Sequence, residues 1–138
     1  MIGYSAYVTT GWLRTLRNYS FVIPQVTLGL HVGDPGVGAL ANVAETDLLT
    51  GVNFDDPVDD PETFVTTMNS TGTPPAWDVT ATGEGQDIKY LSAWDGIDRD
   101  TANWLFNARL SVVERVVDGD VYRLGGGLTL ELPRKAVE

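Results

Sequence analysis

A glycine-rich stretch at residues 30–45 has the composition of a loop that binds a phosphate or a metal ion. It reads LHVGDPGVGALANVAE and follows an apolar segment with the pattern of a strand. A P-loop needs a Lys-Ser or Lys-Thr pair after its glycines, and this stretch contains neither. Pro35 also removes one of the backbone N–H donors that would hold an anion. We therefore expect a structural turn here, because Gly and Pro favour turns.

A second candidate site is the acidic stretch DGIDRD at residues 95–100. The carboxylates of Asp95, Asp98 and Asp100 are the kind of oxygen ligand that Ca²⁺ prefers. The spacing departs from that of an EF-hand, because Gly96 follows the first aspartate directly. A solvated turn between two strands is the better interpretation, and we expect no metal site.

The longest acidic run, NFDDPVDDPETF at residues 53–64, is interrupted by Pro57 and Pro61. This composition is typical of a solvated, extended loop rather than a cage for a cation.

The glycines of the stretch at residues 30–45 do not match the dinucleotide-binding fingerprint either. We therefore expect no cofactor.

His31 is the only histidine, and the chain has no cysteine. A zincin site, a thiolate metal site and a cysteine nucleophile are therefore excluded, and no serine nucleophile elbow accompanies the histidine. The alternation of residues 26–32 places His31 opposite the apolar face, where it is expected to be half-exposed. No two carboxylates stand out as a glycosidase pair. The sequence thus predicts that the protein is not an enzyme.

Charge and hydropathy exclude two classes of partner. The formal net charge is −10 and the nine basic residues are scattered, which argues against binding to nucleic acid or to an anionic membrane. Residues 1–18 lack the basic and apolar regions of a signal peptide, and no apolar run is long enough for membrane insertion. The length of 138 residues predicts one domain, 1–138.

The first 20 residues are expected to form a short helical segment. Apolar residues recur every three or four positions, as on one face of a helix, at Tyr4, Val8, Trp12, Leu16 and Tyr19. Ser5 is a suitable N-cap for this helix.

The rest of the chain has the pattern of short strands. Val26, Leu28, Leu30 and Val32 alternate with other residues, as in a strand with one buried face. Further strands are predicted at 87–94, 104–110, 112–117, 121–124 and 128–132, separated by turn sequences such as DGD and GGG. No alternation of strands and helices is present. The expected fold is mainly β, an antiparallel β-sandwich with a short N-terminal helix and a long acidic, Pro-rich loop.

That loop is expected at residues 46–86, a segment rich in Asp, Pro, Thr and Gly. Its scattered apolar residues suggest a segment that is mobile alone and ordered by a partner. The candidate partner contacts are Phe54, Phe64, Met68 and Trp77. Trp94 and Trp104 are expected in the core.

Residues 26–45, VTLGLHVGDPGVGALANVAE, resemble a segment of the small tail-fibre and minor tail proteins of bacteriophages, especially those that infect actinobacteria. The matching residues are Leu30, His31, Asp34, Pro35, Gly36, Gly38, Asn42 and Glu45. The C-terminal half resembles the same family through SAWDG, NWLFNARL, VDGD and LGGGLTLEL. Residues 46–86 depart from the family, because they lack its Tyr-x-Arg segment.

This resemblance implies a structural role for the stretch at 30–45. Asp34, Pro35 and Gly36 would turn the chain, while Asn42 and Glu45 would form hydrogen bonds with backbone groups of the loop. The resemblance also implies a structural component of a tailed-phage virion, assembled in the host cytoplasm as a minor tail, tail-tip or fibre-associated protein. Its partners would be other virion proteins and copies of itself.

Two other functions fit the same sequence. The chain could be a decoration protein on the capsid, since the same fold and acidic charge would suit that position. It could also be a receptor- or carbohydrate-binding module at the end of a fibre, with a host-surface ligand. Such a module would need an exposed aromatic platform with polar neighbours.

Overall fold

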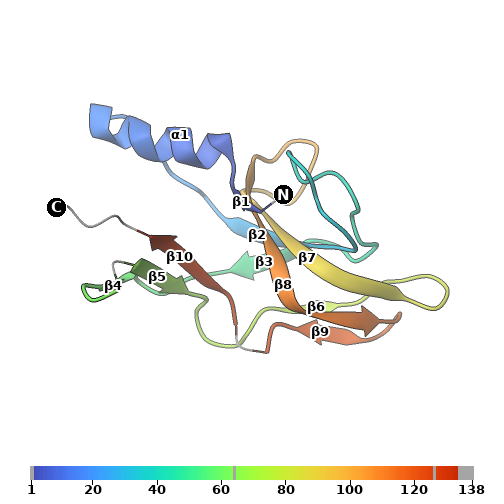
Figure 1. The fold of residues 1–138 in the computed structure, drawn as a ribbon. Helices are drawn as coiled ribbons and strands as arrows, with labels where there is room; N and C mark the ends of the chain where they lie inside the picture. Colours follow the sequence, from blue (N-terminus) through green and yellow to red (C-terminus); the bar gives the residue numbers. More distant parts are fainter. Residues whose placement is uncertain (1, 64, 126, 134–138) are drawn as a thin grey trace.

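The chain forms three antiparallel sheets and one short N-terminal helix in a computed structural model, which describes residues 2–63, 65–125 and 127–133 (Figure 1). The main sheet contains, in spatial order, β1 (Gly3–Tyr4), β8 (Trp104–Val116), β7 (Gln86–Trp94), β2 (Val26–His31) and β3 (Leu49–Val52). A second sheet contains β10 (Thr129–Pro133), β5 (Val65–Asn69) and β4 (Val58–Asp60). A third pairs β6 (Ala76–Asp78) with β9 (Val121–Arg123). The prediction of a mainly β, antiparallel fold is confirmed.

The N-terminal helix α1 (Ala6–Arg14) begins where the sequence predicts. The Ser5 hydroxyl caps it by accepting a hydrogen bond of 3.2 Å from the backbone N–H of Val8. The helix ends earlier than predicted, in a short 3₁₀ turn, η1 (Thr15–Arg17). Asn18, with a φ of 64°, ends this turn in the left-handed conformation, which a helix cannot continue.

The early end of α1 divides the predicted apolar face in two. Val8 is buried, and Tyr4 and Trp12 pack against the core as an edge-to-face pair 5.1 Å apart. Leu16 and Tyr19 lie beyond the helix and are exposed. The predicted continuation of the buried face to residue 19 is therefore wrong.

Strand β2 is buried on both faces, although its sequence predicts only one buried face. It lies between β7 and β3 in the main sheet. Leu28 and Leu30 enter the hydrophobic core, and the two polar side chains that point the other way, Thr27 and His31, are equally inaccessible to solvent. On this second face Leu48 and Arg99 come close to Gly29, so the loops that carry them cover it.

The core lies between the main sheet and the small β6–β9 sheet. Trp77 of β6 is buried, packs 5.7 Å from the ring of Tyr122, and donates a hydrogen bond of 3.2 Å to the Leu28 carbonyl. The expectation that Trp77 contacts a partner is therefore wrong. Trp94 is buried as predicted, whereas Trp104 is only partly buried and donates to the Asn107 side chain.

Residues 46–86 contain four strands, β3 to β6, so the predicted loop excursion is wrong. The run of residues 65–69, rich in Val and Thr, pairs with β10 on one side and β4 on the other. Pro57 and Pro61 flank the edge strand β4, where a missing N–H disrupts no ladder. Phe54 bridges to Ser70 and is partly buried, as is Met68. Phe64 lies outside the described residues.

The other predicted strands are present. Those at 87–94, 121–124 and 128–132 correspond to β7, β9 and β10. Those at 104–110 and 112–117 form one continuous strand, β8, because β7 pairs with it along its length across two register shifts.

Truncation of Leu30 tests the assignment of the core. The variant Leu30→Ala should lower the free energy of unfolding by about 2–5 kcal/mol, because Leu30 is fully buried and its removal leaves a cavity. Urea denaturation followed by tryptophan fluorescence measures the change. Leu16→Ala is the matched control and should change stability by less than about 0.5 kcal/mol, because Leu16 is exposed. Similar losses in the two variants would contradict the assignment.

Candidate functional site

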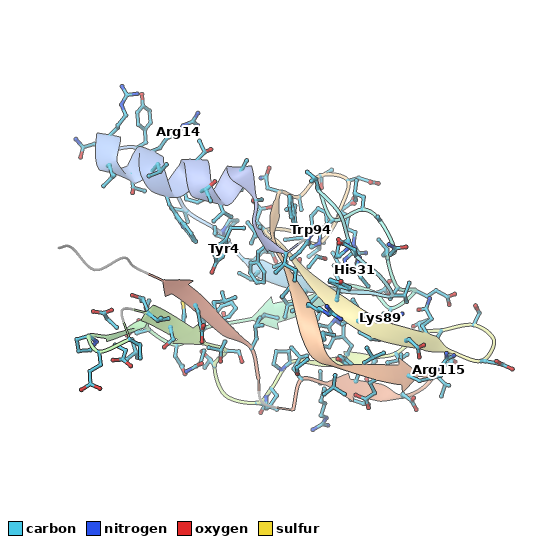
Figure 2. All side chains as sticks on the ribbon, in the orientation of Figure 1. Tyr4, Arg14, His31, Lys89, Trp94 and Arg115 are labelled. Carbon is cyan, nitrogen blue, oxygen red and sulfur yellow. The ribbon has the colours of Figure 1, made fainter. Side chains whose placement is uncertain are left out.

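A chain of buried hydrogen bonds joins His31, Ser92 and Trp94 at one end of the main sheet. The Trp94 indole N–H donates to the Ser92 hydroxyl over 2.9 Å, and His31 Nε2 lies 2.7 Å from the same hydroxyl oxygen. His31 Nδ1 lies 2.9 Å from the backbone carbonyl of Ala41. Figure 2 shows His31 and Trp94 at the end of the sheet that the loop after β2 covers.

The partners fix the direction of every bond in this chain. The Ala41 carbonyl only accepts, so His31 Nδ1 must carry a hydrogen. The Ser92 oxygen accepts from Trp94, and when the ring is neutral the Ser92 hydroxyl donates to the unprotonated His31 Nε2. The neutral form of His31 is therefore the Nδ1–H tautomer. Burial lowers the pKa of His31 from its ordinary value, which favours this neutral form.

The expectation that His31 is half-exposed is wrong, because its side chain has no solvent-accessible surface. The alternation places it correctly on the face opposite Leu30. The loop at residues 32–45 folds back over that face, with the Ala44 N–H donating to the Leu30 carbonyl at 2.9 Å. The sequence could not show that a second layer covers this face.

A serine hydroxyl beside a histidine nitrogen is the arrangement of a nucleophile and its general base. Here neither side chain reaches the surface, and the Ser92 oxygen already accepts from Trp94. A substrate has no path to this oxygen in the folded chain. What the arrangement does is tie β2, β7 and the loop after β2 together through groups that would be costly to bury unpaired.

The loop at 32–45 is held by its own polar groups. The Asp34 carboxylate accepts a hydrogen bond of 2.9 Å from the N–H of Gly36, whose φ of 71° favours glycine. The Asn42 side chain donates to the Asp34 carbonyl at 2.8 Å, and the Asn42 carbonyl accepts from the N–H of Val32. Pro35 is buried, and its carbonyl accepts from the N–H of Ala41. These contacts hold residues 32–45 in a compact turn structure, which we call the corner.

Glu45 has a different partner from the one expected. Its carboxylate accepts from the backbone N–H of Thr82 at 2.7 Å and from the Thr82 hydroxyl at 2.8 Å, so it binds a distant segment instead of its own loop. Asn107 of β8 donates to the Gly36 carbonyl at 2.9 Å. Sequence reasoning missed Ser92 and Asn107. The available signal was a polar residue inside an apolar stretch of each strand.

Arg99 covers the second face of β2 beside this cluster. Its Nε and Nη2 atoms are buried and have no hydrogen-bond partner among the described residues. A Cβ at Gly29 would lie 2.5 Å from Nη2, so glycine is what allows the guanidinium to approach the strand. Burial lowers the pKa of Arg99, and Asp47 nearby opposes this shift. An open cavity of about 520 Å³ beside Arg99 is lined mainly by acidic and apolar side chains, which disfavours an anion there.

The carboxylates of the DGIDRD stretch close its turn. Asp95 accepts from the backbone N–H of Asn103 at 2.7 Å and from its side-chain amide at 2.9 Å. Asp98 accepts from the N–H of Asp100 at 2.9 Å. Within the described ranges, no three His, Cys, Asp or Glu side chains are grouped so that they could hold a metal ion.

The comparisons with known proteins identify no family. No protein-family model matches the sequence, and a search of curated proteins returned no match. Over the part of the chain that the structure describes, no helix combines the length and apolar character needed to cross a bilayer.

The buried histidine predicts a specific dependence of stability on pH. In the unfolded chain the His31 side chain takes up a proton near pH 6.5, whereas in the folded chain burial lowers the pKa of this side chain. Unfolding therefore binds a proton as pH falls, and the free energy of unfolding should drop below about pH 6.5, by at most about 1.4 kcal/mol per pH unit. Denaturation between about pH 5.5 and pH 7.5, above the ordinary range of carboxyl pKa values, measures this slope.

The variant His31→Asn is the control for that slope and should lose it. Since His31 is the only histidine, an NMR titration of its ring in the wild type gives a second measurement if the variant does not fold. A histidine that titrates at its ordinary pKa in the folded protein would contradict the prediction.

Chelation tests the structural interpretation of the acidic turns. Addition of EDTA should leave the thermal midpoint unchanged, because the Asp95 and Asp98 carboxylates are bound to groups of their own loop. Differential scanning fluorimetry with and without EDTA measures this midpoint. A drop of several degrees that added Ca²⁺ reverses would show that one of the acidic stretches binds a metal ion.

Proposed function

We propose that this protein is a structural component of a tailed-bacteriophage virion, in the tail, its tip or a fibre, and acts through contacts with other proteins. The observation that carries this proposal is a concentration of exposed apolar side chains on and just after α1. Leu13, Leu16 and Val22 are 68%, 83% and 71% exposed, and Tyr19 is exposed beside them. Soluble proteins seldom leave such groups together unless a partner covers them.

The position of these residues strengthens the argument. In Figure 1, α1 projects from the main sheet instead of lying flat on it. Only one side of the helix packs inward, through Val8 and Trp12. A projecting helix with apolar residues on its outer side is suited to contact another chain, since burying that surface removes it from water.

The corner at residues 32–45 supports the same function. It carries the residues that resemble those of phage tail proteins, and their polar groups mostly bind other parts of the same chain. A corner held in this way is a rigid element of a scaffold. The absence of solvent access to Ser92 and His31 argues in the same direction, against a hydrolase built on that pair.

The test is to locate the chain in purified particles of the phage or prophage that encodes it. Mass spectrometry of density-purified particles should detect the protein, and immunogold labelling with an antibody against it should mark the tail. Labelling of the head would favour the capsid decoration function instead. Absence from the particles would contradict the proposal.

A pair of variants connects this test to the exposed residues. Leu16→Asp should reduce incorporation into particles at least about tenfold, because it places a charge in the proposed contact. Val112→Asp, at a site of β8 with similar exposure, is the matched control and should be incorporated normally. Both proteins should melt like the wild type, which excludes a folding defect as the cause.

A further inference from the structure

The charges of this chain are segregated along the sequence. No Asp or Glu occurs before Asp34, and the only cationic side chains in that region are Arg14 and Arg17. Between Arg17 and Lys89 the chain contains no Lys or Arg at all. A protein with a net charge of −10 thus begins with a positive segment and continues with a strongly negative one.

The positive segment coincides with the exposed apolar residues. Arg14 ends α1 and Arg17 ends η1, so both lie in the last turn before Asn18. Leu13 directly precedes Arg14, Leu16 directly precedes Arg17, and both leucines are exposed. We call Leu13, Arg14, Leu16 and Arg17 the helix-end patch. Figure 2 shows Arg14 at the end of α1 that points away from the main sheet.

The negative segment carries an exposed groove of complementary character. The outer face of the second sheet has a cavity of about 590 Å³, lined by Val58, Asp60, Pro61, Val65, Thr67 and Glu131 among others. Val58, Thr67 and Glu131 are neighbours across three strands, by the register of β4, β5 and β10. Leu130, which precedes Glu131 in β10, packs against the core. Adjacent residues of a strand point to opposite faces, so the side chain of Glu131 points outward. We call this the acidic groove.

The groove offers apolar contact as well as charge. Val58 is 63% exposed, and Val65 and Pro61 line the same cavity. Glu62 lies in the turn that joins β4 to β5, between the lining residues Pro61 and Thr63 in the sequence, and is exposed. An apolar floor with an acidic rim is the surface expected to receive a leucine and an arginine from a helix end.

We infer that the helix-end patch of one copy docks in the acidic groove of a second copy of this chain. This inference rests on the proposed function and names the partner as the chain itself. Two copies with this net charge repel each other in most orientations, and the N-terminal segment, which has two arginines and no acidic residue before Asp34, offers a contact free of that repulsion. Of the described surface, the helix-end patch is where exposed arginines and exposed leucines occur together.

The arrangement of the two surfaces selects a two-fold dimer. In Figure 1, α1 and the β4–β5 hairpin both extend beyond the main sheet on the same side of the molecule. With a two-fold axis on that side, the contact of one helix-end patch with the groove of the other copy would be repeated in the opposite direction. Burial of Leu13 and Leu16 in these contacts would cover the apolar residues that α1 exposes.

Charge reversal in the purified full-length chain tests this dimer. Sedimentation over a concentration series up to the millimolar range should show a dimer in the wild type. The variant Arg14→Glu with Arg17→Glu, and the variant Glu62→Lys with Glu131→Lys, should each weaken the dimer at least about tenfold. A mixture of the two variants should form a heterodimer, because both of its contacts again join opposite charges.

The matched control is Arg109→Glu with Arg123→Glu, which lowers the net charge as much as the helix-end reversal but lies elsewhere on exposed strand positions. This control should dimerise nearly as the wild type does. Circular dichroism and thermal melting must show that all variants fold.

A wild type that stays monomeric at millimolar concentration would overturn the inference, as would variants that fail to recombine in the mixture. If the chain is monomeric yet present in particles, the proposed function stands and the partner of the helix-end patch is another virion protein. If the dimer forms as described but particles lack the chain, the dimer interface stands and the proposed function falls.

Discussion

Strand β2 is covered on both faces, and this burial requires every polar group along it to find a partner inside the protein. His31 is the most demanding of these groups, because a buried imidazole needs both of its nitrogens satisfied. Ser92 on β7 and the Ala41 carbonyl in the loop after β2 supply the two partners. One histidine thus links a neighbouring strand and a folded-back loop.

The corner after β2 follows from the same requirement. Its position over His31 is held by Asn42 and Asp34 within the loop and by Glu45 and Asn107 to more distant segments. Because these polar groups are bound within the chain, the corner is a fixed part of the scaffold. The surfaces that we propose for contacts with other proteins lie elsewhere, on α1 and on the sheet that contains β4.

Those two surfaces differ in charge and share an apolar component. A net charge of −10 keeps copies of the protein apart in general, and the proposed contact uses the N-terminal region where the sign reverses. Such an arrangement makes contacts specific, because most other orientations bring like charges together.

The sequence alone determined the type of most elements, because local patterns report local physics. The Ser5 cap, the period of three to four before Arg14 and the alternation in β2 and β7 each follow from the geometry of one element. Only the tertiary structure decided which faces are covered. His31 and Trp77 looked like surface residues because what buries them comes from distant parts of the chain: the loop at 32–45 for His31, and the packing of β6–β9 against β2 for Trp77. The strands within 46–86 were missed for the same reason. Strands β4 to β6 are short and separated by proline-containing segments, and two of them pair with the distant strands β10 and β9.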